Sequence, residues 1–128
     1  MTSESAVLAA NQSFYRAFEK KDLDAMVAIW SHGTDCLCIH PGREALQGWE
    51  AIRLSWEKIF RGTAYLEIET EILRVDVSNQ LAYVVLLENV LQVLGSRQGR
   101  ATSIATNLFE CMGGTWYLIH HHGSPIMT

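Results

Sequence analysis

Two adjacent glycines, Gly113 and Gly114, constrain the fold of this chain more than any other feature of its sequence. They join two segments, 101–112 and 115–124, in which apolar and polar residues largely alternate. A two-residue Gly-Gly connection between such segments is a strong signal for a β-hairpin, because glycine adopts the positive φ angles that the tight turn requires. We therefore expect the two segments to pair as antiparallel strands.

The hairpin determines which polar side chains lie together. If Met112 lies opposite Thr115, counting back along the two strands places Asn107 opposite His120. Side chains alternate between the two faces of a strand, so His122 shares the face of His120 and the histidine between them takes the other face. This register predicts that Asn107, His120 and His122 lie on one face of the sheet.

The first half of the chain has the apolar spacing of amphipathic helices. Helices are predicted for residues 5–21, for a shorter segment whose N-cap is Asp22, and for residues 48–60. A short strand over residues 35–40 lies between the last two helices and ends at Pro41, which has no N–H to donate.

The second half of the chain predicts long antiparallel strands. The alternation over residues 66–77 shifts by one residue near Ile72, which predicts a β-bulge that bends the sheet. The next strand, 81–94, is apolar on both faces, so both faces must be covered. Since the helices can cover only the concave side, we expect a homodimer in which the convex sheet faces of two copies pack together.

The order of these elements predicts an α+β fold, a cone in which three N-terminal helices pack on a strongly curved, bulged antiparallel sheet. With 128 residues, the chain is expected to form one domain over residues 1–128. A net charge of −4 without long basic runs argues against nucleic-acid binding. The sequence shows no membrane span, secretory signal or disulfide framework, so we expect a cytoplasmic protein that does not bind membranes.

Several short motifs give the chain a resemblance to a known superfamily. They are Lys21-Asp22-Leu23-Asp24-Ala25, Ile39-His40-Pro41-Gly42, Gly48-Trp49, Thr106-Asn107-Leu108-Phe109 and His120-His121-His122-Gly123-Ser124. With them the chain resembles the SnoaL-like branch of the nuclear transport factor 2-like superfamily, which is related to the association domain of calcium/calmodulin-dependent kinase II and to ketosteroid isomerases. The resemblance implies a pocket between the helices and the concave sheet face, and functions from isomerisation to pure assembly.

The resemblance also suggests site residues. The position of the general-base aspartate in steroid isomerases corresponds to His40, and imidazole, with a free pKa of about 6.5, can act as a base near neutral pH. The tyrosine of those enzymes corresponds to Phe14, which has no donor, and Tyr15 is expected to point about 100° away around the helix. Their second oxyanion donor corresponds to Asn107, whose neutral amide donates a weaker hydrogen bond. These differences argue against steroid isomerase activity.

The histidines leave a metal site open as an alternative. His120 and His122 are two residues apart on a strand, so their Cα atoms are about 6.5 Å apart, and His40 could supply a third ligand to zinc or iron. The competing interpretation is that they form ordinary hydrogen bonds. Because the superfamily generally lacks a metal, we predict no metal and no cofactor. His121 and Glu88 are expected on the convex face, as a polar pair at the dimer interface.

The sequence thus predicts a protein that binds a small, largely apolar organic molecule. The expected pocket residues are Trp49, Trp56, Asn89, Asn107, His120 and His122. Two other functions stay open. One is a cofactor-free isomerase, cyclase or lyase with His40 as base and Asn107 as donor, similar to ketosteroid isomerases, polyketide cyclases or the iota-class carbonic anhydrases, whose His-His-His-Ser-Ser ending the chain resembles. The other is a non-catalytic assembly module.

Overall fold

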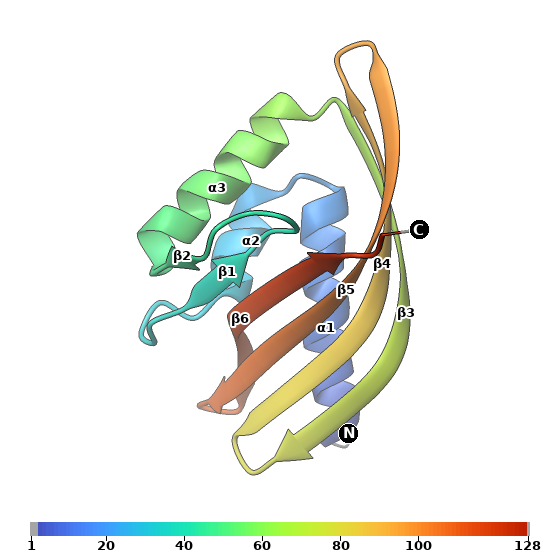
Figure 1. Ribbon diagram of the computed structural model, residues 1–128. Coiled ribbons are helices and arrows are strands. Elements are labelled where there is room, and N and C mark those ends of the chain that lie inside the picture. The colour runs from blue at the N-terminus through green and yellow to red at the C-terminus, as the bar shows by residue number, and fades with distance from the viewer. Residues whose placement is uncertain (1–2, 128) are drawn as a thin grey trace.

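The computed structural model describes residues 3–127. Within them, three helices lie on one side of a six-stranded, strongly curved sheet (Figure 1). The helices are α1 (Ser3–Glu19), α2 (Leu23–Ile29) and α3 (Trp49–Gly62). The strands are β1 (Leu37–Ile39), β2 (Leu46–Gln47), β3 (Tyr65–Ser78), β4 (Leu81–Leu94), β5 (Arg97–Met112) and β6 (Thr115–Pro125), in the spatial order β2-β1-β6-β5-β4-β3. The predicted α+β cone is confirmed.

The sheet is mixed, whereas an antiparallel sheet was expected. β1 runs parallel to β6, and every other neighbouring pair is antiparallel. The short strand β2, which the sequence did not predict, pairs with β1 and completes this edge of the sheet. The parallel pairing brings the end of β1, and with it His40, beside the histidines of β6.

Local sequence signals account for the helix boundaries. The Asp22 side chain accepts a hydrogen bond from the Ala25 backbone N–H at 3.1 Å, so Asp22 is the N-cap of α2, as predicted. Lys21, with φ of 54°, turns the chain between α1 and α2, and its Nζ donates to the Thr63 carbonyl oxygen at 2.9 Å. This contact ties the α1–α2 turn to the end of α3.

Two β-bulges shape the sheet. The predicted bulge in β3 is present, because the pairing with β4 shifts between Ile72 and Arg74. A second shift, between Leu108 and Phe109, gives β6 one additional residue opposite β5. From Met112 back to Phe109 the hairpin has the expected register, but beyond the bulge Asn107 lies opposite His121. The predicted pairing of Asn107 with His120 was therefore wrong by one residue.

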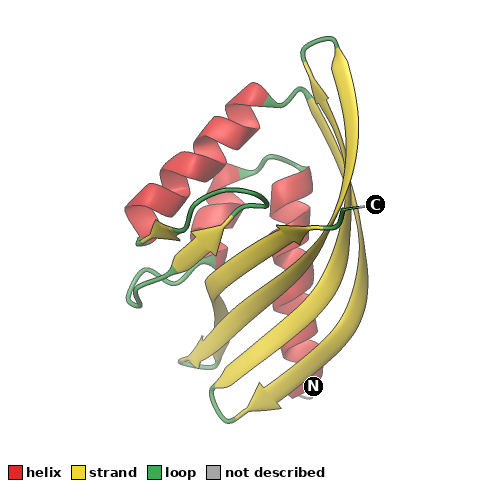
Figure 2. Ribbon diagram, in the orientation of Figure 1, coloured by secondary structure: helices red, strands yellow, loops and turns green. Residues whose placement is uncertain are grey.

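The core fills the space between the helices and the concave sheet face. Its largest buried side chains come from all three helices and from the sheet, and include Phe14, Met26, Trp30, Ile52, Trp56, Leu86, Phe109 and Leu118. The described helices all lie on this side, and the convex face carries none of them (Figure 2). No helix in residues 3–127 is both long and apolar enough to cross a membrane.

Candidate functional site

A ring of polar side chains is buried between α1 and the sheet. Tyr15 donates its hydroxyl hydrogen to Glu88 Oε2 at 2.5 Å. Asn107 Nδ2 donates to Tyr15 Oη at 3.1 Å and to Asn11 Oδ1 at 2.9 Å. His121 Nδ1 lies 2.6 Å from Asn107 Oδ1, and its Nε2 lies 4.0 Å from Glu88 Oε2, which closes the ring. We call these five residues the buried ring.

Burial determines the ionisation of the buried ring. Desolvation raises the pKa of Glu88, and the Tyr15 hydroxyl partly opposes that rise. Desolvation lowers the pKa of His121 to about 3, so its imidazole is neutral at pH 7. Because the Asn107 oxygen accepts, His121 Nδ1 carries the hydrogen and Nε2 is an unprotonated acceptor that faces Glu88. The buried ring is therefore a set of hydrogen-bonded side chains in which a neutral imidazole faces the Glu88 carboxyl group.

His40 lies at the end of β1, where a tight turn begins. The Arg43 backbone N–H donates to the His40 carbonyl oxygen at 2.9 Å, and Gly42, in the third position of the turn, has φ of 74°. Pro41 in the second position fits the type II turn, which requires a positive φ at the residue that follows it. The sequence His-Pro-Gly-Arg therefore holds the Arg43 side chain near the His40 ring.

Hydrogen bonds around the His40 ring assign its tautomer. Its Nε2 lies 3.0 Å from Ser55 Oγ, and Ser55 donates its only hydroxyl hydrogen to the Ile52 carbonyl oxygen at 2.7 Å. Nε2 must then be the donor to Ser55, which leaves Nδ1 unprotonated. Burial and the nearby Arg43 charge lower the pKa of His40 to about 4, so the ring is neutral at pH 7. His40 has the form of a base at neutral pH.

Trp56 connects His40 to the buried ring. Its indole packs against His40, with ring centroids 4.9 Å apart, and against His121 at 6.3 Å. The His40 and His121 rings are themselves 6.4 Å apart. The Trp56 N–H is buried and has no hydrogen-bond partner in residues 3–127. A buried donor without a partner is costly, and the Trp30 N–H and the Ser31 hydroxyl share this state in the described residues, so it is not specific to Trp56.

An open groove of about 670 Å³ lies beside His40, between α3 and the β1–β2 connection. It is lined by His40, Pro41, Arg43, Glu44, Leu46, Ser55, Lys58 and Ile59. We call it the His40 groove. It combines a neutral imidazole, two cations, one carboxylate and apolar side chains.

The structure brings together some of the predicted site residues and separates others. His40 and Trp56 are in contact, and Asn107 lies in the buried ring, where both of its amide hydrogens are already donated. Asn107 therefore orients the ring and has no free donor for a ligand. Trp49 is half-buried and stacks on His32 at 4.6 Å. Neither Trp49 nor the fully buried Trp56 lines the His40 groove, although both were predicted as pocket residues.

His120 and His122 point to the convex face, not to the concave face as predicted. The additional residue in β6 reverses the alternation, so the buried histidine is His121. His120 and His122 remain neighbours, with ring centroids 6.3 Å apart. The expectation that His121 and Glu88 form a pair on the convex face was right about the pairing and wrong about the face.

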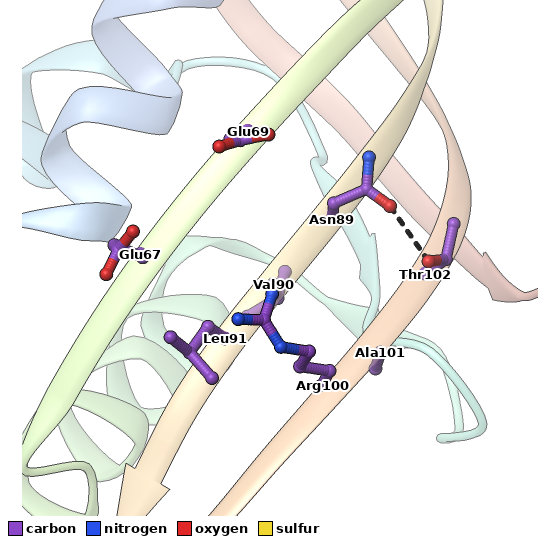
Figure 3. Close-up of a pocket in the computed structure, with 8 residues that line it drawn as sticks. All are labelled: Glu67, Glu69, Asn89, Val90, Leu91, Arg100, Ala101 and Thr102. Carbon is purple, nitrogen blue, oxygen red and sulfur yellow. Dashed lines mark hydrogen bonds between the residues drawn. The ribbon is translucent and has the colours of Figure 1, made fainter.

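Asn89 is also on the convex face. It accepts a hydrogen bond from Thr102 Oγ1 at 2.8 Å and lines a shallow hollow with Glu67, Glu69 and Arg100 (Figure 3). Its neighbour Glu88 takes the buried position. Because side chains alternate along β4, only one of the two can face the core, and the Tyr15 hydroxyl selects Glu88.

Sequence reasoning missed Tyr15, Glu88 and Asn11 as interior residues, although signals were present. Asn11 and Tyr15 are four residues apart on α1, and such residues share one face of a helix. Glu88 continues the buried row of Val84 and Leu86 at a spacing of two. A polar residue at the spacing of a buried stripe is the pattern that predicts a buried polar cluster.

The described residues contain no group of three or more His, Cys, Asp or Glu side chains arranged to hold a metal ion. In particular, His40 lies on the concave side of β6, whereas His120 and His122 lie on its convex side. The three-histidine site left open by the sequence is therefore not assembled.

Comparison with known proteins places the chain in a family. The pattern of the SnoaL-like domain matches residues 7–128. The chain belongs to the SnoaL-like domain family. This SnoaL-like chain is 25% identical over 122 residues to F-box protein SKIP8 of Arabidopsis thaliana, and the match covers 95% of the chain. The chain spans only 50% of the length of that relative.

Solved structures of the nuclear transport factor 2-like superfamily have the same fold as this SnoaL-like chain. A proposed dehydratase from Streptomyces avermitilis is 27% identical with a TM-score of 0.90, and the match covers 98% of this chain and 96% of that one. A proposed calcium/calmodulin-dependent protein kinase type II association domain from Thiobacillus denitrificans is 26% identical with a TM-score of 0.81. This match covers 93% of this chain and 94% of that one.

Proposed function

We propose that this SnoaL-like chain binds a small, largely apolar organic molecule in the His40 groove and catalyses a cofactor-free lyase or isomerase reaction on it. The observation that carries the proposal is the state of His40, which is neutral at pH 7, has an unprotonated Nδ1 and lines an open groove. The similarity to a proposed dehydratase supports this class of reaction, since dehydration and isomerisation both require a proton transfer.

In this proposal His40 removes a proton from a carbon of the bound molecule. The Nε2–H donor to Ser55, backed by the Ile52 carbonyl, holds the ring while Nδ1 accepts the proton. The resulting imidazolium is acidic because burial and Arg43 disfavour its charge, so it readily returns the proton to another position or to a leaving hydroxyl. His40 would thus serve first as base and then as acid.

The buried ring supports the site from behind. Trp56 packs against both His40 and His121, so the position of Trp56 depends on His121 and on the side chains that hold it. Burying Glu88 and His121 is energetically costly, and such clusters are frequent at functional sites. We assign Asn107 and Tyr15 the role of positioning residues in this arrangement.

The test uses a His40→Gln variant. The native protein is incubated in D₂O with a panel of β,γ-unsaturated ketones and β-hydroxy ketones, and NMR follows deuterium uptake, isomerisation and loss of water. Loss of a general base typically costs a factor of about 10²–10⁴ in rate. We expect His40→Gln to lose the activity by such a factor and to retain its fold. Equal activity in both proteins would contradict His40 as the base.

A homodimer through the convex sheet face is a second part of the proposal. The central strands present half-exposed apolar side chains there, namely Val85, Leu87, Ile104 and Leu108, of which Ile104 is 40% exposed. Such a patch is typical of an isologous interface. Three further expectations remain predictions: the chain forms one domain, it acts in the cytoplasm and it binds no nucleic acid.

A further inference from the structure

The walls of the His40 groove carry more positive than negative charge, although the chain has a net charge of −4. Arg43 lies on the β1–β2 connection and Lys58 on α3, so the two cations come from opposite walls. Glu44 is the single carboxylate that lines the groove. The groove is therefore locally cationic on an acidic protein.

These two cations form no ion pair with any side chain in residues 3–127. Other basic residues nearby are engaged: Arg53 and Arg61 on the same helix both pair with Glu57, and Lys21 donates to the Thr63 carbonyl oxygen. Glu44, although it lines the same groove, pairs with neither cation. Arg43 and Lys58 thus have charge and donors available for a ligand.

Local structure places both cations relative to His40. Arg43 is the last residue of the type II turn that begins at His40. The turn keeps the Arg43 charge near enough to the His40 ring to lower the pKa of His40. Lys58 follows Ser55, the partner of His40, by three residues on α3, so the two lie on the same helix face. The remaining lining is apolar and consists of Pro41, Leu46 and Ile59.

We propose that the ligand of the His40 groove is a small amphipathic organic acid, whose carboxylate is bound by Arg43 and Lys58 and whose apolar body packs on Leu46 and Ile59. This inference rests on the proposed function and adds the charge of the substrate to it. Arginine favours carboxylates because its guanidinium can donate two parallel hydrogen bonds to them, and lysine adds a point charge. An anion also complements the cationic groove of a protein that otherwise repels anions.

The test compares two molecules of the same shape and different charge. Titration calorimetry measures binding of 2-naphthoate and 2-naphthamide to the full chain, with the smaller pair benzoate and benzamide as a second set. We expect the carboxylate to bind at least about tenfold more tightly than the amide. Its affinity should fall as salt is raised from 50 to 500 mM, whereas that of the amide should stay unchanged.

Variants locate the effect. Arg43→Gln and Lys58→Gln should each weaken carboxylate binding by about three- to thirtyfold and leave amide binding unchanged, because only the charge-assisted contact is lost. Arg53→Gln is the matched control: it lies on the same helix, is paired with Glu57 and does not line the groove, so carboxylate binding should not change. Circular dichroism and thermal unfolding confirm that each variant is folded.

The outcomes separate the two proposals. If carboxylate and amide bind equally, or if Arg43→Gln and Lys58→Gln have no effect, the anionic ligand is excluded while the groove remains a binding site. If neither member of either pair binds the native protein, the His40 groove is not a small-molecule site, and the proposed function fails together with this inference. A preference for the carboxylate that each variant weakens supports the anionic ligand and the groove as a binding site, while the His40→Gln comparison tests the catalytic part of the proposed function.

Discussion

At the scale of single residues, Tyr15 makes the buried ring possible. Its hydroxyl donates to Glu88 and accepts from Asn107, so it links the carboxylate to the amide that holds His121. Burial raises the pKa of the Tyr15 hydroxyl well above its usual value, and the charge of Glu88 raises it further. The hydroxyl therefore remains protonated and acts only as a hydrogen-bond donor to Glu88.

Replacing Tyr15 with Phe is expected to lower the free energy of unfolding by about 1–3 kcal/mol, because Glu88 loses its hydrogen bond in a buried position. Urea denaturation measures the change. Tyr65→Phe is the control: the exposed Tyr65 hydroxyl donates to the exposed Glu67 carboxylate, and its loss should cost less than about 0.5 kcal/mol. Equal effects of the two substitutions would mean that the buried ring contributes little to stability.

His40 predicts a pH dependence of stability. Burial lowers its pKa from 6.5 to about 4, so between these values the unfolded chain binds a proton that the folded chain does not. Stability from this group is complete above pH 6.5 and is lost as the pH falls towards 4. Arg43, Cys38 and the neutral His121 surround the ring, and none of them supplies a negative charge that would stabilise the imidazolium.

In His40→Gln the loss of stability between pH 6.5 and pH 4 should be smaller than in the native protein by about 1–2 kcal/mol. The full pKa shift would give more, but the ring is only half-buried and solvent reduces the effect. Glu88 acts in the opposite direction, since its raised pKa favours the folded state at low pH, and it is common to both proteins. Urea denaturation at a series of pH values measures the difference. Parallel stability profiles of the native protein and the variant would mean that burial does not lower the pKa of His40.

At the scale of elements, β6 packs closely against the turn that carries His40. A Cβ atom added at Gly123 would lie 2.8 Å from Pro41 Cγ and 3.0 Å from Cδ. Only glycine allows the turn to approach β6 this closely. The resemblance to the His-His-His-Ser-Ser ending of the iota-class carbonic anhydrases therefore ends at Gly123, since a serine there would displace Pro41.

Gly123→Ala should push the Pro41 turn outward, lower the free energy of unfolding by about 1–3 kcal/mol and weaken 2-naphthoate binding, because His40 and Arg43 flank the displaced residue. Gly99→Ala is the control, since no atom lies within 4 Å of an added Cβ and its φ angle is not positive. Denaturation and calorimetry on both variants provide the comparison. Unchanged stability and binding in Gly123→Ala would show that the Pro41 turn can move away from β6 without a loss of free energy of unfolding.

The elements themselves could be predicted from the sequence because each long one carries a clear apolar period, and the β3 bulge is marked by the adjacent apolar residues Ile72 and Leu73. The β5–β6 bulge has a similar mark at Leu118 and Ile119, but the three histidines that follow can lie on either face and conceal the shift. The candidate base His40 could be predicted from the family pattern. The buried ring could not be predicted, because its members come from four separate segments and their contacts depend on the one-residue shift between β5 and β6.

At the scale of the whole molecule, the described helices cover one face of the sheet (Figure 2). The other face carries partly exposed apolar side chains at its centre. Glu67, Glu69 and Arg100 lie towards one end of this face, and His120 and His122 lie on β6 at the other side of the centre. An apolar patch with a polar rim is the arrangement of a stable protein interface.

Ile104, at the middle of this face and 40% exposed, provides the test. We expect the native protein to elute as a dimer in size-exclusion chromatography with light scattering, and Ile104→Glu to elute as a folded monomer, because the interface would bury an unpaired carboxylate. Leu54→Glu is the control: Leu54 is 48% exposed but lies on α3, away from the convex face, and its substitution should leave the dimer intact. A dimer that persists in Ile104→Glu would exclude the convex face as the interface, and a native monomer would contradict the proposed homodimer.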